Sequence, residues 1–504
     1  MKAETSEQAP RHTFQAGAVA VFAGLLLLLL LLTAPRHGPW FDEFCTRYFS
    51  DPAVSLSDAF FKRWIEDVHP PLFSLLAWLS SHVVRLPIEQ ARLLNLIPLG
   101  LVTFYLVLLA AISPRERAFL AALGISVSCG SFFVEYFAEF RSYFTGMCAF
   151  LALTATLVAQ DRGTAEGKGA GAVLWCGYLT SAAISLNLHY LTTLMTVVLV
   201  AIFGVTAALK GDWRRFAAYL LSGFILCLPF AVVFVYQWAT VERISNDYWL
   251  KTGMPEAITM LADAIIMPAS HAQGLVATAW VMAVILLLRK RERRPLDPTV
   301  GTLIVAVIAE IAVLLVYTKL TAAMTDRYLM PLAILSAAVL AIVLSDEIVR
   351  RRWLLALFIV TNLGGAVATA ATRWNDPRWD EAAQYLSARQ GACPGSRIIP
   401  MQQDPNDHTP NTLDNYNEAY AYMAAKWKLT LGRVDEPSAR PRDPACPDYY
   451  WADHFFAAGK SETTLLDQFA RRFPLLQGCT IKATPFSSMS AVFEVTGEPP
   501  ACQR

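Results

Sequence analysis

The 504-residue sequence predicts an all-α polytopic membrane domain over residues 1–372 and a small α/β domain outside the membrane over residues 373–504. Two observations lead to this prediction. First, 55% of the residues are apolar and only 16% are charged, whereas a soluble domain carries roughly 25% charge. Second, apolar stretches long enough to span a bilayer recur up to residue 372, and the tail beyond is polar. The net charge of +1 gives no sign of nucleic-acid binding.

The first apolar stretch, residues 15–34, predicts a transmembrane anchor. It follows a polar head that contains Lys2 and Arg11, so a signal peptide is the alternative. An uncleaved anchor fits better, because the apolar run is long, no small-x-small cleavage site is evident and Pro35 follows directly. Ten further spans bring the total to about eleven. They are expected at 92–112, 118–137, 142–160, 171–188, 190–209, 216–236, 272–288, 299–317, 328–344 and 353–372.

The distribution of basic residues predicts the orientation of these spans. Five short loops between them contain 15 Lys or Arg among 35 residues, and one loop holds the basic run 289–294. The connections on the other side contain 10 in about 109 residues before the tail. Because basic loops stay in the cytoplasm, the N-terminus is expected inside and the C-terminal domain in the periplasm. The chain is therefore expected to be a multi-pass protein of the cytoplasmic (inner) membrane.

Segment 70–85 is apolar but is not counted as a span. Counting it would invert every later loop and place the basic clusters outside, and the segment is short and polar at 80–82. It is expected to form a helix at the outer interface or to be only partly inserted. A second such helix is expected at about 55–65. Residues 35–91 are thus predicted to form a structured first external loop.

The tail is expected to form helices and short strands. Asp376-Pro377 predicts a helix start, with Pro at the first helical position, and Gly391 can end this helix. The other expected elements are helices at 415–427 and 461–473 and strands at 397–401 and 491–495. An even set of cysteines in an oxidising compartment predicts two disulfides, with three pairings open. These cysteines are Cys393, Cys446, Cys479 and Cys502.

Ionisable and aromatic residues from several separate connections are predicted to meet at the outer face of the bilayer. Carboxylates are costly to hold at this edge, so they indicate chemistry rather than packing. Basic residues there oppose the orientation bias, and an anionic partner such as a phosphate explains Arg141, Lys319 and Arg327. The candidate residues are Asp42, Glu43, His69, Glu139, Arg141, Tyr143, His189, Tyr190, Lys319, Asp326, Arg327 and Tyr328.

Each candidate also has a purely structural interpretation. The acidic pair fits a helix cap or an ion pair with Arg36 or Arg47. Arg141 fits a pair with Glu139, or a side chain that snorkels to lipid headgroups. The other basic and imidazole groups fit turns, span ends and hydrogen-bonded interface positions; these are His69, His189, Lys319 and Arg327. No cluster of His, Cys and carboxylate residues has the spacing of a metal site.

Several motifs resemble those of the C-type integral-membrane glycosyltransferases. This group includes the protein O-mannosyltransferases and the lipid A aminoarabinose and galacturonosyl transferases. Phe41-Asp42-Glu43, after the first span, resembles the acidic motif of their first external loop. The other motifs are DVHPPL at 67–72, AEFRSY at 138–143, NLHY at 187–190, DRYLMP at 326–331 and RWDEAA at 378–383. The resemblance covers about residues 1–390.

The resemblance implies the transfer of a sugar from a polyprenyl monophosphate to an acceptor hydroxyl outside the membrane, with inversion. Asp42 is then the expected base, and Glu43 is expected to orient the base or the acceptor. The departing phosphate is already an anion, so it needs the cations of Lys319, Arg327 and Arg141 more than a general acid. The remaining residues are expected to bind the donor phosphate or substrate; they are His69, Glu139, Tyr143, His189 and Tyr328.

The expected acceptor is a cell-envelope glycolipid such as lipopolysaccharide, a polysaccharide or a protein. No cofactor is required by this chemistry, although some members of the group use a divalent metal ion. A lipid-linked sugar transporter or flippase is the alternative function. Transporters place ionisable groups near the bilayer midplane, often in repeated halves, whereas here these groups cluster at one surface. A second alternative is a scaffold protein in which the tail alone carries the function. It would not explain the many spans or the charged residues at the outer face.

Overall fold

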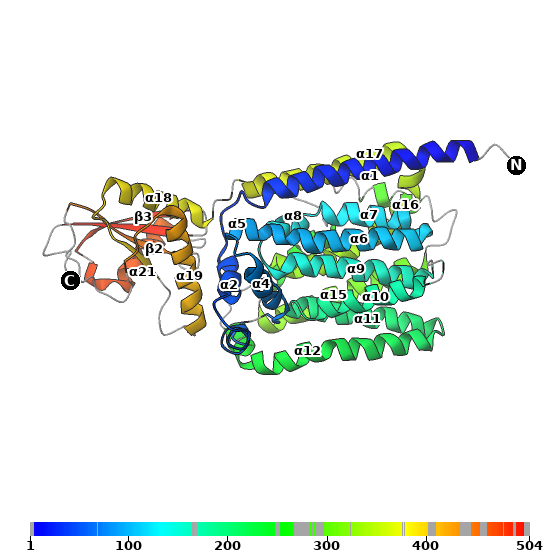
Figure 1. The fold of residues 1–504 in the computed structure, drawn as a ribbon, viewed down its shortest axis with the longest axis horizontal. Helices are drawn as coiled ribbons and strands as arrows, with labels where there is room; N and C mark the ends of the chain where they lie inside the picture. Colours follow the sequence, from blue (N-terminus) through cyan, green and yellow to red (C-terminus); the bar gives the residue numbers. More distant parts are fainter. Residues whose placement is uncertain are drawn as a thin grey trace. The chain divides into compact units, whose positions relative to one another are not determined.

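The computed structural model describes residues 5–67, 69–163, 167, 169–246, 252–266, 280, 282–284, 286–288, 297–322, 324–374, 376, 378–401, 410–432, 445–453, 461–476, 478–486 and 490–497. The predicted class of fold is confirmed, because long apolar helices precede a small four-stranded sheet (Figure 1). Among the described residues, seven helices are long and apolar enough to cross a membrane, and a bent pair makes an eighth. Most of the predicted span 272–288, and the run 289–294, lie outside the described residues.

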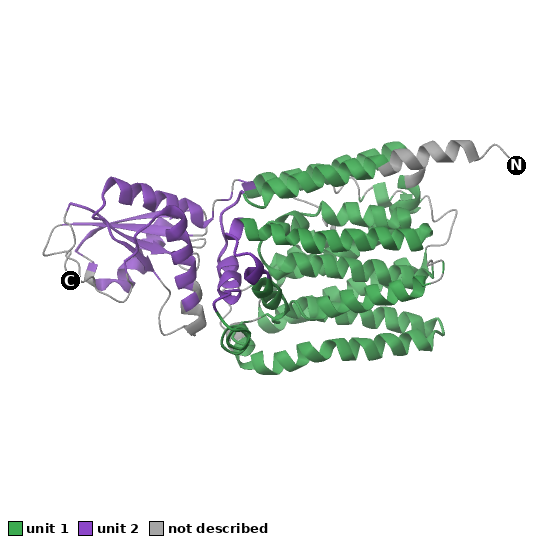
Figure 2. Cartoon of the chain, viewed as in Figure 1, with its two compact units in different colours: residues 1–35, 54–79, 90–373 green, residues 36–53, 80–89, 374–504 purple. Residues whose placement is uncertain are grey.

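The chain divides into two compact units (Figure 2). Unit 1 comprises residues 1–35, 54–79 and 90–373, and unit 2 comprises residues 36–53, 80–89 and 374–504. The first external loop is therefore shared between the units. Its two outer portions belong with the tail, and its middle portion belongs with the helical unit.

Unit 1 is built of helices packed around a buried central helix, α9 (Ser142–Arg162). Almost every residue of α9 is buried, and small residues such as Gly146 and Ala155 allow neighbouring helices to approach closely. The other elements that lie wholly or partly in unit 1 are α1 (Thr5–Thr33), α3 (Leu56–Asp58), η1 (Ala59–Trp64), α4 (Leu72–Val83), α5 (Ile88–Ala91), η2 (Arg92–Asn95), α6 (Leu96–Ile112), η3 (Pro114–Glu116), α7 (Arg117–Ser128), α8 (Ser131–Phe137), α10 (Ala170–Leu186), α11 (Tyr190–Leu209), α12 (Trp213–Asn246), α13 (Met254–Ile266), α15 (Pro298–Thr321), η4 (Asp326–Leu329), α16 (Met330–Arg350) and α17 (Arg352–Trp374). Helices α4, α5 and α17 include residues of unit 2.

The predicted span over 118–137 is apolar enough to cross a membrane but is broken by a bend, which was not predicted. The chain forms two helices there, α7 and α8, which meet at a bend of 64°. Gly130 lies at the bend with an extended backbone, and Ser131 follows it. Gly–Ser pairs are common sites of kinks because they lack bulky side chains. The apolar run continues across the bend, so hydropathy alone does not reveal it.

The two helices predicted in the middle of the first loop are present. Helices α3 and η1 cover 56–64, and α4 has 12 residues, which is too short to span a bilayer. Among the longer described helices, α2 (Phe41–Phe49) and α13 were not predicted. Helix α2 belongs to unit 2.

Unit 2 contains a mixed sheet with strand order β1-β2-β4-β3. Strands β1 (Ile398–Met401) and β2 (Asp448–Ala452) are parallel, and β4 (Ser490–Thr496) is antiparallel to both β2 and β3 (Thr480–Phe486). Alternate residues of β2 face opposite sides. Tyr449 and Trp451 join the core with α18 (Trp379–Ala392) and α19 (Pro410–Trp427), whereas Ala452 joins the core with α21 (Glu462–Arg472). The sheet therefore lies between two helical layers.

The predicted strands at 397–401 and 491–495 and the predicted helices in the tail are confirmed. Helix α18 starts at Trp379, slightly after the predicted start at Asp376-Pro377, and Gly391 lies inside its last turn. Strands β2 and β3 were not predicted, and β3 contains Pro485. Proline removes a ladder donor, and β3 tolerates it as an edge strand of this sheet.

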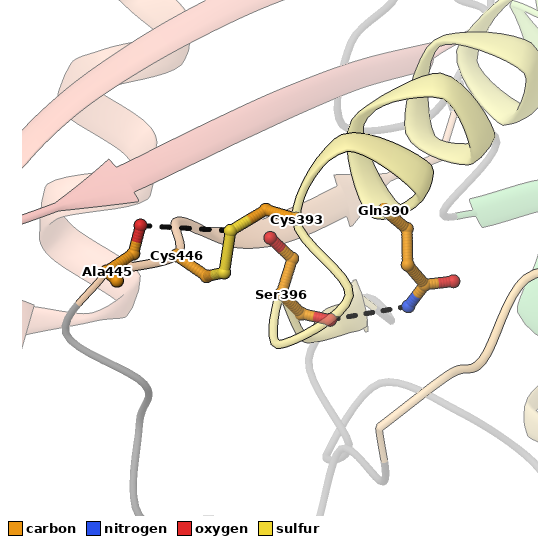
Figure 3. Close-up of a disulfide and its surroundings, with 5 residues drawn as sticks. All are labelled: Gln390, Cys393, Ser396, Ala445 and Cys446. Atoms are coloured by element: carbon orange, nitrogen blue, oxygen red, sulfur yellow. Dashed lines mark hydrogen bonds between the residues drawn. A yellow bond between two sulfur atoms is a disulfide. The ribbon is translucent and has the colours of Figure 1, made fainter.

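A disulfide joins Cys393, at the end of α18, to Cys446, just before β2 (Figure 3). Their Cα atoms are 5.8 Å apart, and 53 residues separate them in sequence. By the loop-entropy model, closing a loop of this length stabilises the fold by about 4 kcal/mol. Cys479 is disulfide-bonded as well, and Cys502 lies outside the described residues.

Candidate functional site

Three helix starts bring candidate residues to one end of unit 1. Arg141 precedes α9, His189 precedes α11, and Thr325 precedes η4, which carries Arg327 and Tyr328. All three preceding residues have an extended backbone, with φ of −143°, −158° and −135°. This conformation is typical of residues that precede a helix. The segments that precede α9, α11 and η4 are short, so the candidate side chains on them stay close to the helix ends.

His189 lies at the centre of a cluster of rings. Its imidazole centre is 5.1 Å from that of His69, 5.7 Å from that of Tyr143 and 5.6 Å from that of Tyr328. The rings of His69 and Tyr143 are 6.5 Å apart. Four candidates from four separate segments of the sequence therefore meet in one cluster, which we call the ring cluster.

His189 is held as a neutral imidazole. Burial lowers the pKa of His189 well below its usual value of 6.5, and the charges of His69, Arg327 and Arg141 lower it further. Its Nδ1 accepts a hydrogen bond from the backbone N–H of Leu191 at 3.2 Å. The proton of the neutral ring is therefore on Nε2, which is a hydrogen-bond donor.

Two guanidinium groups lie over the ring of Tyr143. The Cζ atoms of Arg327 and Arg141 are 5.4 Å and 5.7 Å from the ring centre. Arg327 Nη1 also donates to the hydroxyl of Tyr143 at 2.7 Å. Guanidinium groups present several N–H donors in a fork that matches phosphate oxygens. These two side chains can thus donate several hydrogen bonds to an anion such as a phosphate.

Asn95 fixes the backbone that leads to Arg141. Its buried side-chain amide donates to the carbonyl oxygens of Tyr136, Phe137 and Glu139, at 3.3, 3.0 and 2.9 Å. These groups lie at the end of α8, where backbone carbonyls have no partner within the helix. Asn95 was not among the predicted candidates, although an asparagine directly before an apolar helix is a signal of such a role.

Gln237 of α12 performs a similar task for His69. Its Nε2 lies 2.7, 3.0 and 3.0 Å from the carbonyl oxygens of Trp64, Asp67 and His69. Its Oε1 accepts from the hydroxyl of Tyr190. Asp67 Oδ1 is 3.3 Å from His69 Nδ1. Gln237 and Asp67 are thus supporting residues that were not predicted.

Two other candidates lie at the margin of this end. The carbonyl of Glu139 accepts from the backbone N–H of Arg141 at 3.0 Å, and the Glu139 side chain is buried. Lys319 is exposed in the last turn of α15, and it has no ion pair or hydrogen bond with the described residues. The described residues contain no group of three or more His, Cys, Asp or Glu placed to hold a metal ion.

Asp42 and Glu43 lie in the first turn of α2, in unit 2. Glu43 is fully buried, and its Oε2 accepts a hydrogen bond from the backbone N–H of Trp40 at 3.0 Å. Glu43 therefore caps α2, a helix that was not predicted. Asp42 is only partly buried.

No protein-family model matches the chain, and no curated protein sequence matches it. Solved structures do match. The crystal structure of ArnT from Cupriavidus metallidurans bound to undecaprenyl phosphate matches with a TM-score of 0.55 and 12% identity, over 95% of this chain and 98% of that one. The apo state of ArnT matches with a TM-score of 0.56 over the same shares. The predicted C-type glycosyltransferase fold is thereby confirmed.

Proposed function

We propose that this chain, which has the fold of ArnT, is an inverting glycosyltransferase of the cytoplasmic membrane. It moves a sugar from a polyprenyl-phosphate donor to an acceptor hydroxyl of a cell-envelope glycolipid, polysaccharide or protein on the outer side. The observation that carries the proposal is the convergence of Arg141 and Arg327 on Tyr143 beside the ring cluster. The lipid phosphate bound to ArnT supports this type of donor.

In the proposed reaction, Asp42 accepts the proton of the acceptor hydroxyl as its oxygen attacks the anomeric carbon. The bond between this carbon and the phosphate oxygen breaks, and the electron pair leaves with the phosphate. A single displacement inverts the anomeric centre. Arg141 and Arg327 stabilise the charge that develops on the phosphate, and His189 Nε2–H adds a neutral donor. Glu43 keeps α2 capped rather than touching the substrate.

An ion network at the opposite end of unit 1 supports transfer rather than transport. Helix α9 begins at the ring cluster and ends at Arg162, which pairs with Glu116 at 2.5 Å and with Asp297. Beside it, Asp161 pairs with Lys210 at 2.6 Å. These residues tie together the ends of α7, α9, α11 and α15. A transporter has to open both ends in turn, and this network holds one end closed.

The experiment that tests the proposal compares a deletion strain with strains that carry variants. Mass spectrometry of envelope glycans in the deletion strain should show one sugar missing, which names the sugar and its acceptor. Complementation with Asp42→Asn should leave product formation lower by about 10²–10⁴-fold, because only the base is removed. Asp51→Asn, a matched change outside the first turn of α2, should restore the product. Normal product levels with Asp42→Asn would contradict the assignment of the base.

A further inference from the structure

Helix α19 of unit 2 presents a stripe of polar residues to the first external loop. Asp414, Glu418, Tyr422 and Lys426 recur at every fourth position, so they lie along one face of the helix. All four bond to loop segments that belong to unit 2. We call these four residues the α19 stripe.

Half of the α19 stripe holds the last turn of α2. Glu418 Oε1 accepts a hydrogen bond from Arg47 Nε at 2.7 Å. Asp414 Oδ2 accepts from the hydroxyl of Tyr48 at 3.1 Å. Arg47 and Tyr48 lie one to two turns beyond Asp42 on the same helix, so these bonds limit how α2 can rotate or slide.

Rings fix the first turns of the same helix. Phe41 lies 4.7 Å from the ring of Tyr416, and Phe44 lies 5.3 Å from that of Trp379. All four rings are buried in the core between the helices and the sheet. Asp42 therefore lies between two anchored aromatic residues. Its position follows from the core of the tail domain.

The other half of the stripe, Tyr422 and Lys426, bonds to Ile88 and Glu89 near the end of the first external loop. The hydroxyl of Tyr422 donates to Glu89 Oε2 at 2.6 Å and accepts from the backbone N–H of Ile88 at 3.0 Å. Lys426 Nζ donates to Glu89 Oε1 at 2.5 Å. The ring of Tyr422 also lies 5.0 Å from the Arg47 guanidinium. Tyr422 thus connects both loop segments.

We propose that the α19 stripe is a positioning device that sets where α2 holds Asp42, so that the tail domain controls the rate of transfer. This inference rests on the proposed function, in which Asp42 is the base. A base acts only within hydrogen-bonding reach of the hydroxyl, and a displacement of about 1 Å can cost about 10²-fold in rate. Residues of the stripe are positioning residues, because they act through α2.

Two single-hydroxyl deletions on α19 separate positioning from stability. Tyr422→Phe removes the hydrogen bonds to Glu89 and Ile88 of the first external loop. Tyr420→Phe, the matched control, removes bonds to the carbonyl oxygens of Met401 and Trp451 in the sheet, at 3.1 and 3.0 Å. Only Tyr422→Phe should lower product formation, by about 10–10²-fold. It should also speed hydrogen–deuterium exchange of the amides in α2.

A charge reversal gives a second, independent test. Arg47→Glu places two carboxylates together and should lower product formation, whereas Arg47→Glu combined with Glu418→Arg should restore it to within about threefold. Binding of undecaprenyl phosphate to the full-length protein in nanodiscs should stay unchanged in every variant of this set. A variant that merely unfolds the protein would lose that binding.

The outcomes distinguish this inference from the proposed function. If Asp42→Asn and Arg327→Ala abolish product but Tyr422→Phe and Arg47→Glu do not, the proposed function stands and the positioning role is wrong. If Tyr422→Phe and Tyr420→Phe lose product formation equally, and in proportion to their falls in melting temperature, the positioning role is also wrong. Normal product with Asp42→Asn overturns the proposed function first, and the inference with it.

Discussion

At the residue scale, burial decides the charge of His189 and hence its chemical role. A neutral imidazole with its proton on Nε2 donates to a substrate oxygen without adding to the positive charge of Arg141 and Arg327. The sequence places His189 next to the outer face. It does not reveal the charge, because the rings that bury it come from segments far apart in the sequence.

This environment predicts a pH dependence of stability. The pKa of His189 lies well below 6.5 in the folded protein and close to 6.5 in the unfolded chain. The unfolded state therefore takes up a proton first, and stability falls as the pH drops below about 6.5. His189→Gln should lose less melting temperature between about pH 7 and pH 5 than the parent protein. An identical pH profile for the two proteins would show that His189 does not carry this effect.

Glu310 is a second residue whose surroundings the sequence does not disclose. It is fully buried in α15, and neither of its carboxyl oxygens has a hydrogen-bond partner within the described part of the chain. A buried polar group without a partner costs about 1–3 kcal/mol. Glu310→Leu should therefore raise the melting temperature in detergent.

Ile308→Leu, at an exposed position of α15, is the control for Glu310→Leu and should leave the melting temperature unchanged. Product formation should stay normal in both variants. A lower melting temperature or a loss of product with Glu310→Leu would reveal a role for the carboxyl group that its contacts do not explain.

At the element scale, apolarity predicts where helices lie better than where they bend or what they touch. The bend between α7 and α8 lies inside one apolar run, so it was missed. Helix α2 was missed for another reason. It is short and three of its residues are charged, namely Asp42, Glu43 and Arg47. Its apolar face is buried by α18 and α19, which lie more than 300 residues away in sequence.

Close packing of α10 gives a prediction at this scale. A Cβ atom on Gly177 would clash with the hydroxyl of Tyr105, which bonds to Thr156 Oγ1 at 2.7 Å. Gly177→Ala should therefore destabilise the protein by about 1–3 kcal/mol through overpacking. A Cβ atom on Gly171 of the same helix would have no neighbouring atom within 4 Å, so Gly171→Ala should leave the stability unchanged or raise it. The comparison is a thermal melt of the two variants in the same detergent, and equal melting temperatures would contradict the predicted clash.

At the scale of the whole molecule, the distribution of charge separates the two ends of unit 1. The short basic loops contain Arg162 and Lys210 of the ion network, and the opposite end holds the ring cluster. Charge bias and motif spacing were enough to predict that Tyr143, His189 and Tyr328 meet. They were not enough to predict the division of the first loop between two units, because that depends on contacts with the tail.

The proposed chemistry also predicts the response to metal removal. The leaving phosphate is stabilised by arginine side chains, so transfer by the purified protein should continue in excess EDTA. Initial rates with and without the chelator are the measurement. A loss of activity that added Mg²⁺ or Mn²⁺ restores would show that the reaction uses a metal ion.

The most direct test uses purified protein and lipids extracted from the deletion strain, which should hold unused donor and acceptor. The wild-type protein in nanodiscs should move one sugar between these lipids, with mass spectrometry as the readout. Asp42→Asn and Arg327→Ala should move almost none. If the wild-type protein transfers no sugar, or both variants transfer it at the wild-type rate, then the proposed function is wrong.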